Sequence, residues 1–328
     1  MVAAQRIDAW RGLKEEMFPM SFLVRFPQAS YRADALDGFT VTPGFTPGNA
    51  QAMMWLSQLA YETDDRDKVD NILKALGLEM RGFGADTPAT GLVPPKARFI
   101  VAVGRDATFV TLSGTDPLSI KDWITDFTLE PSPNVFHKGF AEAVGAVRSD
   151  IEAAIRSGGA GQPLFFTGHS MGGALANIAA LRALDAGLRA TAIYTFGGPR
   201  TGGQRFFEAY EPLGESTFRL VNGNDIVPAV PPSLPLGNFR HVGQMVRCGS
   251  GSTFAGQVPE SKEGNDPSLI QIGLRTLGAA DIFHLKIPSI EELRDIDPRT
   301  LDQSDILPGV VRDHVPASYF RALSVTIP

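Results

Sequence analysis

The chain has 328 residues, of which 43% are hydrophobic and 20% charged, the composition of a globular protein with a sizeable core. Its formal net charge of −6 and its pI near 5.4 argue against a nucleic-acid partner, because such proteins usually present a basic surface. The single cysteine, Cys248, excludes an internal disulfide and is neutral about the cellular compartment.

Neither a secretory signal nor a membrane-spanning segment is indicated near the N-terminus. Residues 1–10 lack the charged-then-apolar pattern of a signal peptide, and the apolar run 17–26 is short and interrupted by Arg25. We therefore expect a cytoplasmic protein or one exported without a classical signal. Composition says nothing about the oligomeric state.

The first quarter of the chain predicts an irregular segment followed by two helices. Residues 1–48 contain scattered prolines and glycines and are expected to wrap the surface. Residues 50–61 place Met, Trp and Leu side chains at helical spacing, as a core helix does. Residues 63–67 are rich in aspartate but lack the glycine and distal glutamate of a calcium loop, so we expect them to cap a helix over 68–76.

Two β-branched runs, 98–103 and 108–112, predict a hairpin. The next segment predicts a short amphipathic helix that is either an ordinary surface helix or a lid over the site. Its apolar stripe consists of Ile120, Trp123, Ile124 and Phe127.

The second half of the chain alternates between predicted strands and helices. A long helix is expected over 136–155. After it we expect strand 163–167, helix 173–184, strand 191–196, helix 202–210, strand 217–221, an antiparallel strand 238–247 and helix 317–323. This alternation predicts one α/β domain over residues 1–328, with a mostly parallel, doubly wound sheet and helices on both faces. Residues 249–310 are expected to form an insertion over the site.

The motif Gly-His-Ser-Met-Gly over residues 168–172 predicts a nucleophile elbow centred on Ser170. An apolar strand precedes it and a helix rich in small residues follows. Glycine at 168 and 172 removes side chains that would clash in so sharp a turn. The helix N-terminus and the Met171 N–H then favour negative charge beside Ser170. The alternative is a glycine-rich turn in which the serine merely caps the helix.

A serine nucleophile needs a base and a carboxylate that orients the base, in the chain order Ser, Asp, His. Asp225 directly follows an apolar strand, where a carboxylate at the end of the sheet belongs, although it could also be a turn aspartate capping its own loop. His314 follows it near the end of the chain, just before a predicted helix. The other histidines fit less well for reasons of order, geometry or apolar surroundings: His137, His169, His241 and His284.

A series of separate motifs in one order resembles the class 3 lipases, the fungal-lipase-like branch of the α/β-hydrolases. These motifs are Gly114-Thr115, Trp123 with Asp126, residues 137–140, 168–176, 196–200, 222–228 and 241–243, and Asp313-His314 with Tyr319. The resemblance implies the α/β-hydrolase fold, Ser170 as nucleophile, Asp225 as orienting carboxylate and His314 as base. It also implies Thr115 as the oxyanion-hole residue, with the Met171 N–H as its partner.

The chain departs from the family pattern in three places. Ser113 stands where the family often has arginine, so an ion pair is lost there, and residues 116–119 form a longer connection to the predicted lid. The fungal members carry disulfides, which this chain cannot form internally, so it looks more like the bacterial members.

Together these features predict a cofactor-free serine carboxylic-ester hydrolase. We expect a triacylglycerol lipase or esterase that acts through an acyl-enzyme on acyl-chain esters, with transient contact to a lipid interface. The apolar lid stripe and the apolar loop 226–236 favour an acyl chain over a charged substrate. Metal is not required, because no His or carboxylate cluster has ligand spacing. A phospholipase A1, a feruloyl-type esterase or an acyltransferase would keep the same triad. A non-catalytic binding protein is the alternative from another class.

Overall fold

The computed structural model describes residues 24–85, 97–114, 133–159, 161–231, 239–260 and 309–327, with only the helical backbone for 133–138. The predicted lid stripe, Thr115 and His284 lie outside these residues, as does most of the expected insertion. The division into one domain with an N-terminal wrap and an insertion at 249–310 therefore stays a prediction.

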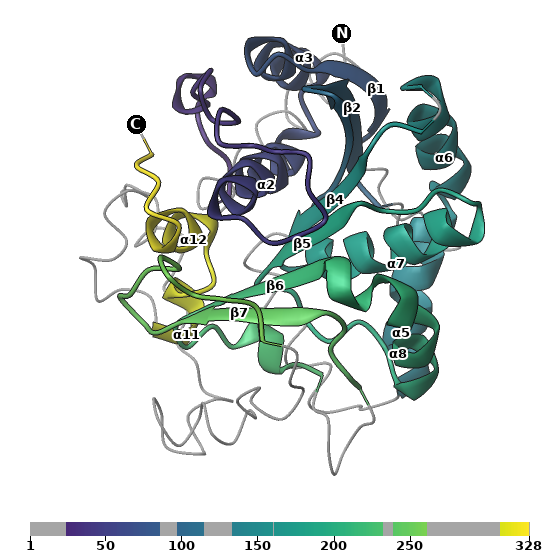
Figure 1. Cartoon of the computed structure of the whole chain (residues 1–328), viewed down its shortest axis with the longest axis vertical. Helices are drawn as coiled ribbons and strands as arrows, with labels where there is room; N and C mark the ends of the chain where they lie inside the picture. Colours follow the sequence, from purple (N-terminus) through teal and green to yellow (C-terminus); the bar gives the residue numbers. More distant parts are fainter. Residues whose placement is uncertain are drawn as a thin grey trace, which may run out of the picture.

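A mixed sheet forms the centre of the described structure (Figure 1). Its seven strands lie side by side in chain order: β1 Glu79–Gly84, β2 Phe99–Gly104, β3 Ala107–Leu112, β4 Leu164–His169, β5 Ala192–Phe196, β6 Thr217–Asn222 and β7 Gln244–Cys248. The strands β1 to β3 pair antiparallel and the strands β3 to β7 pair parallel. The predicted hairpin and the mostly parallel α/β sheet are confirmed.

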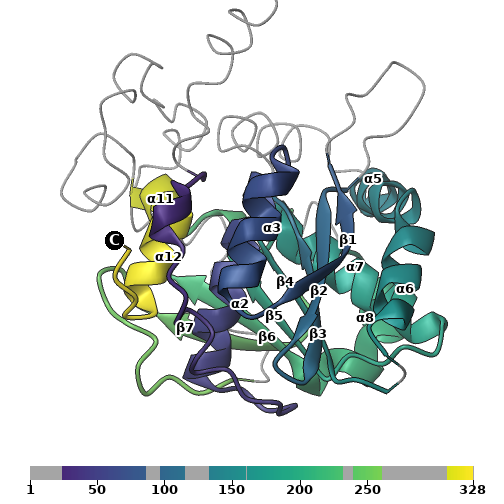
Figure 2. The same cartoon turned by 90° about the horizontal axis from the view of Figure 1, so that it is seen from above.

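Helices cover both faces of this sheet, as predicted (Figure 2). One face packs against α2 Pro47–Leu59, α3 Arg66–Ala75 and α12 Pro316–Ala322. The other packs against α5 Pro133–Gly145, α6 Arg148–Ser157, α7 Met171–Asp185 and α8 Gln204–Tyr210. The other helical elements of the described residues are short: η2 Gln28–Ser30, η3 Ala60–Glu62, η4 Glu211–Ser216, η5 Val227–Ala229 and α11 Gly309–Arg312. The strands follow one another across the sheet in chain order, so the helices that connect the parallel strands lie on one face. The helices on the other face come from the segments before β1 and after β7.

Two hydrophobic cores result from the alternation of side chains along each strand. Phe109, Phe165 and Tyr194 point into the core under α2. An adjacent residue in each of these strands points into the core under α7: Val110, Phe166 and Ile193. Strands buried on both faces read as continuous apolar runs, which explains the Phe-rich sequence of β4.

Helix α2 begins and packs as its sequence indicates. The Thr46 side chain accepts a hydrogen bond from the Asn49 N–H, and Pro47 occupies the first helical position, where its missing N–H costs nothing. The Trp55 ring lies 4.3 Å from the ring of Phe320 in α12. In the following turn Asp65 caps α3 by accepting from the Lys68 N–H, so the capping role predicted for the aspartate-rich stretch is confirmed.

Two local predictions are wrong, and one strand was not predicted. The expected helix 136–155 is two helices, since α5 ends at Gly145, a poor helix former, and α6 begins at Arg148. The strand β1 was not predicted, because it contains two glycines and exposed charges and forms through pairing with β2. The expected antiparallel strand 238–247 is instead the parallel strand β7, which begins only at Gln244.

Replacing Phe165 by alanine tests the core under α2. The side chain is fully buried and its ring lies 5.0 Å from Phe39 and 5.9 Å from Phe109. We expect Phe165→Ala to lower the free energy of unfolding by about 3–5 kcal/mol, measured by urea unfolding. The control Val41→Ala, at a side chain 46% exposed, should change it by less than about 0.5 kcal/mol. Equal effects of the two substitutions would contradict this packing.

Candidate active site

Ser170 occupies the turn between β4 and α7. Its backbone has φ 59° and ψ −135°, a region that residues with a side chain rarely adopt. The Ser170 N–H donates to the carbonyl oxygen of Phe196 at 2.8 Å, which ties the turn to the end of β5. The predicted strand–turn–helix arrangement is therefore present, with Ser170 at the carboxyl end of a central strand.

Two glycines allow α7 to pack directly onto the strands. A Cβ atom at Gly168 would lie 2.2 Å from the carbonyl oxygen of Gly172, and one at Gly172 would lie 2.3 Å from that of Leu112 in β3. Both distances are far below van der Waals contact. The neighbouring backbone therefore leaves no room for a side chain at either position, as predicted for these glycines.

The three residues predicted as nucleophile, base and orienting carboxylate lie in one hydrogen-bonded line. His314 Nε2 is 3.0 Å from Ser170 Oγ, and His314 Nδ1 is 2.9 Å from both carboxylate oxygens of Asp225. Asp225 follows β6, and His314 lies between α11 and α12. All three side chains are buried. This is the geometry in which an imidazole can take a proton from a serine while a carboxylate holds the ring.

The carboxylate of Asp225 is surrounded by donors. Besides His314, it accepts from the Tyr319 hydroxyl at 2.7 Å and from the Val227 N–H at 2.9 Å. A buried charge is costly unless such partners are present. Burial, and then the charge of Asp225, raise the pKa of Tyr319 well above its ordinary value, so this hydroxyl stays a donor. Gly197 leaves the room for the cluster, since a Cβ there would lie 2.5 Å from Asp225 Oδ2.

A second network, which the sequence did not reveal, holds the loop of His314. Asn222 Nδ2 donates to the carbonyl oxygen of Asp313 at 2.9 Å, and the Asn224 N–H donates to the Asp313 carboxylate at 2.8 Å. Burial raises the pKa of Asp313. Through these bonds the turn that carries Asp225 also positions the residue before His314. The polar stretch 222–225 was the only sequence signal for this role.

Two other histidines have structural partners. His241 Nε2 is 2.7 Å from the carbonyl oxygen of Pro228, and the residue precedes β7, which corrects its predicted place within a strand. His169 contacts Tyr61 and the His314 backbone. His137 lies in α5, where only the helical backbone of this residue is described.

Of the two predicted oxyanion donors, Met171 is described. It is the first residue of α7, and the first N–H groups of a helix have no partner within the helix. The Gly114 carbonyl, one residue before Thr115, accepts from Arg98 at 2.8 Å and from the Ser113 hydroxyl at 3.0 Å. The guanidinium of Arg98, in the segment that leads into β2, thus lies at the carboxyl end of β3. Ser113 stands at this end, where class 3 lipases often have an arginine.

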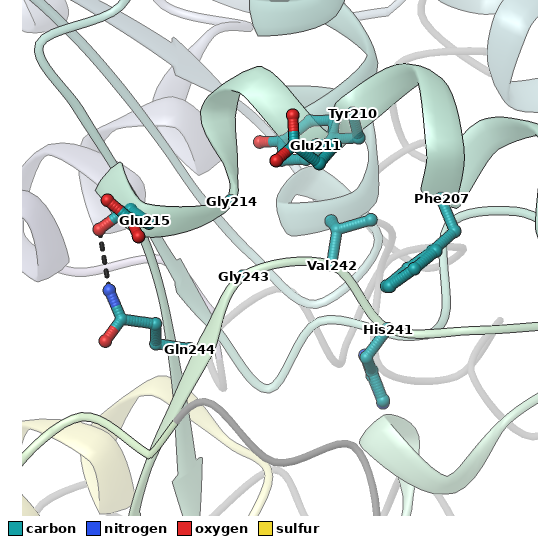
Figure 3. A pocket seen from close by; sticks show the side chains of 9 residues that line it. All are labelled: Phe207, Tyr210, Glu211, Gly214, Glu215, His241, Val242, Gly243 and Gln244. Carbon is teal, nitrogen blue, oxygen red and sulfur yellow. Dashed lines mark hydrogen bonds between the residues drawn. The ribbon is translucent and has the colours of Figure 1, made fainter.

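The described residues also line pockets away from Ser170. One pocket, of about 510 Å³, lies between α8 with η4 and the segment that leads into β7 (Figure 3). Phe207, His241 and Val242 are among its lining residues. At its edge Gln244 Nε2 donates to the carbonyl oxygen of Glu215 at 2.6 Å. Within the described residues, no group of three His, Cys, Asp or Glu side chains is arranged to hold a metal ion.

Comparison with known proteins identifies the segment that contains the elbow. Residues 109–234 match the family model described as Lipase (class 3). This segment is therefore similar to the class 3 lipases. It includes Ser170 and Asp225, whereas His314 lies beyond it.

Proteins similar to this chain include ones from fungi, a plant and a nematode. The chain is 31% identical over 132 residues to the secreted mono- and diacylglycerol lipase 1 of Fusarium solani, covering 38% of this chain and 39% of that protein. It is 34% identical over 139 residues to a lipase of Rhizomucor miehei, covering 38% of each. The chain thus spans about two fifths of the curated relatives it matches. The solved Rhizomucor miehei lipase propeptide complex superposes with a TM-score of 0.52 at 21% identity over 78% of this chain and 79% of that one, which shows a shared fold.

The buried His169 predicts a pH dependence of stability. Burial, followed by the nearby His314, lowers the pKa of His169 well below 6.5; the groups that face it are Tyr61, His314 and Tyr319. The unfolded chain therefore binds one more proton below about pH 6.5, and stability falls as the pH falls from there toward the folded pKa.

Urea unfolding at a series of pH values measures this effect. Wild type should lose up to about 1.4 kcal/mol more per pH unit below 6.5 than His169→Gln, which cannot titrate. Parallel stability curves for the two proteins would show that His169 does not stay neutral in the folded state.

Proposed function

We propose that this chain is a serine carboxylic-ester hydrolase of the lipase type, acting on acyl-chain esters. The observation that carries the proposal is the hydrogen-bonded line from Asp225 through His314 to Ser170, with Ser170 on a glycine-flanked elbow. The match of residues 109–234 to the class 3 lipase family model supports the same chemistry.

The proposed reaction begins with attack of Ser170 Oγ on the ester carbonyl carbon. His314 Nε2, 3.0 Å away, takes the hydroxyl proton, and the imidazolium is stabilised by Asp225. The carbonyl oxygen becomes an oxyanion, for which we assign the Met171 N–H and Thr115 as donors. The tetrahedral intermediate then collapses, its C–O bond to the alcohol breaks, and His314 returns the proton to the departing alkoxide.

Hydrolysis of the acyl-enzyme repeats these steps with water. His314 removes a proton from water as the water oxygen attacks the acyl carbon, and the same donors hold the oxyanion. Collapse releases the fatty acid, and His314 protonates Ser170 Oγ. The cycle uses no group beyond the chain and water.

Acylglycerols are the substrate class we favour. The matches to the Fusarium solani mono- and diacylglycerol lipase and to the Rhizomucor miehei lipase extend over 132 and 139 residues. A match to the chloroplastic phospholipase A1-Igamma1 of Arabidopsis thaliana, 41% identical, extends over only 73 residues, 20% of this chain. A phospholipid is therefore the second candidate. That the chain is of the bacterial type stays a proposal, supported by its lone cysteine.

Contact with a lipid surface is part of the proposal and rests on the sequence alone. The stripe of Ile120, Trp123, Ile124 and Phe127 is apolar enough to cover a site in water and to enter a lipid interface when it opens. No helix among the described residues is long and apolar enough to span a bilayer.

Ser170→Ala tests the proposed nucleophile. Turnover of p-nitrophenyl esters of increasing chain length should fall by roughly 10⁴- to 10⁶-fold for every ester that wild type cleaves, because no other group completes the line. The control Ser252→Ala, at an exposed loop residue, should keep wild-type rates. Turnover by Ser170→Ala within about tenfold of wild type would mean that another nucleophile acts.

Trp123→Ser tests the lid. Each large apolar side chain buried in lipid contributes about 1.5–3 kcal/mol, so its loss should weaken interfacial opening. We expect a much larger drop on emulsified long-chain esters than on dissolved short-chain ones, at an unchanged melting temperature. Equal drops on both substrates together with a lower melting temperature would instead indicate a helix packed permanently on the core.

A further inference from the structure

His169, the residue immediately before Ser170, holds the loop that carries His314. Its Nε2 atom lies 2.7 Å from the carbonyl oxygen of His314, and its Nδ1 atom lies 2.8 Å from the hydroxyl oxygen of Tyr61. The side chain is 1% exposed. Both ring nitrogens therefore have partners inside the protein, and one of these partners is the backbone of the proposed base.

The partners determine where the proton of His169 sits. A carbonyl oxygen can only accept, so Nε2 carries the hydrogen and donates to His314. In a neutral imidazole the other nitrogen is then an acceptor, and the Tyr61 hydroxyl donates to Nδ1. The neutral state agrees with the burial of the ring, which lowers the pKa of His169. Tyr61 thus selects the tautomer that can hold the His314 loop.

The two imidazole rings also face each other. Their centroids are 4.8 Å apart, and their planes are tilted by 32°. During the proposed reaction the His314 ring becomes positively charged. A second positive ring at this distance would oppose that charge, whereas a neutral His169 does not. The His169 ring can therefore support His314 from the side without disfavouring proton transfer.

We propose that His169 is a positioning residue, which sets the place of the His314 imidazole relative to Ser170. His169 and Ser170 are neighbours in the same turn, so the hydrogen bond to the His314 carbonyl connects the base directly to the backbone of the nucleophile. For its effect on catalysis this inference rests on the proposed ester hydrolysis.

Proton transfer between Ser170 and His314 depends closely on the distance between Oγ and Nε2. Proton transfer requires Nε2 and Oγ about 2.6–3.2 Å apart, and in this structure they lie 3.0 Å apart. Misplacing a reacting group by about 1 Å can cost roughly 10²-fold in rate. Loss of the His169 donor should therefore reduce turnover more than substrate binding.

A pair of amide substitutions isolates the donor. The side-chain nitrogen of glutamine reaches the place of Nε2, whereas that of asparagine reaches only the place of Nδ1. We expect His169→Asn to lower kcat about 10- to 100-fold with KM changed less than about twofold, and His169→Gln to recover kcat to within about fivefold of wild type. In a His314→Ala background His169→Asn should cause no further loss, because its effect passes through His314.

A second measurement does not depend on ester turnover. In ¹⁵N-labelled protein, the Nδ1–H resonance of His314 reports its hydrogen bond to Asp225. His169→Asn should shift or broaden this resonance, and His169→Gln should preserve it. If wild type shows the resonance and this response but cleaves no ester, the proposed function fails and the positioning role stands.

Melting curves establish that each variant is folded, and His169→Phe, which keeps a ring of similar size, replaces the asparagine variant if that one does not fold. Wild-type kcat and an unchanged His314 resonance in the variant without the donor would overturn the inference. So would equal losses in folded Asn and Gln variants, because then the hydrogen bond at Nε2 is not what holds the loop.

Discussion

The sharp turn at Ser170 is the constraint on which the rest of this molecule depends. A non-glycine residue at positive φ costs on the order of 1–3 kcal/mol and persists only when its surroundings enforce it. Here β4 ends directly before the turn, α7 begins directly after it, and the Ser170 N–H is held by β5. The contacts at Gly168 and Gly172 leave no room for a side chain. The packing of α7 on the sheet and the place of Ser170 are therefore one structural feature.

The buried charge of Asp225 imposes the second requirement. A carboxylate removed from water needs donors, and these come from its own turn, from His314 and from Tyr319 in α12. The C-terminal helix is thus part of the site. Phe320 of the same helix packs against Trp55 of α2. One helix thus contributes both to the hydrophobic core under α2 and to the hydrogen bonds of the Asp225 carboxylate.

Polar contacts between distant segments join these two features. The His314 backbone accepts from His169, 145 positions earlier, and Asn222 and Asn224 hold the preceding Asp313. The elbow, the turn after β6 and the loop before α12 therefore form one hydrogen-bonded unit at the carboxyl ends of the strands. In an α/β sheet such ends meet at one edge, which is why residues so far apart in the chain lie within hydrogen-bonding distance of one another.

The sequence by itself determined the features that depend on near neighbours. The glycine pattern of the elbow, the cap of α3 and the hairpin β2–β3 could be predicted because local sterics and periodicity produce them. The assignment of Ser170, Asp225 and His314 followed from the chain order typical of this fold and from the resemblance to the class 3 lipases. The tertiary structure alone decided the rest. The glycine-containing β1 becomes a strand only beside β2, and β7 takes its direction from β6. The link from His169 to His314 and the anchoring of Asp313 join segments that lie apart in the chain. No local pattern encodes such pairs, because their hydrogen bonds exist only after the chain has folded.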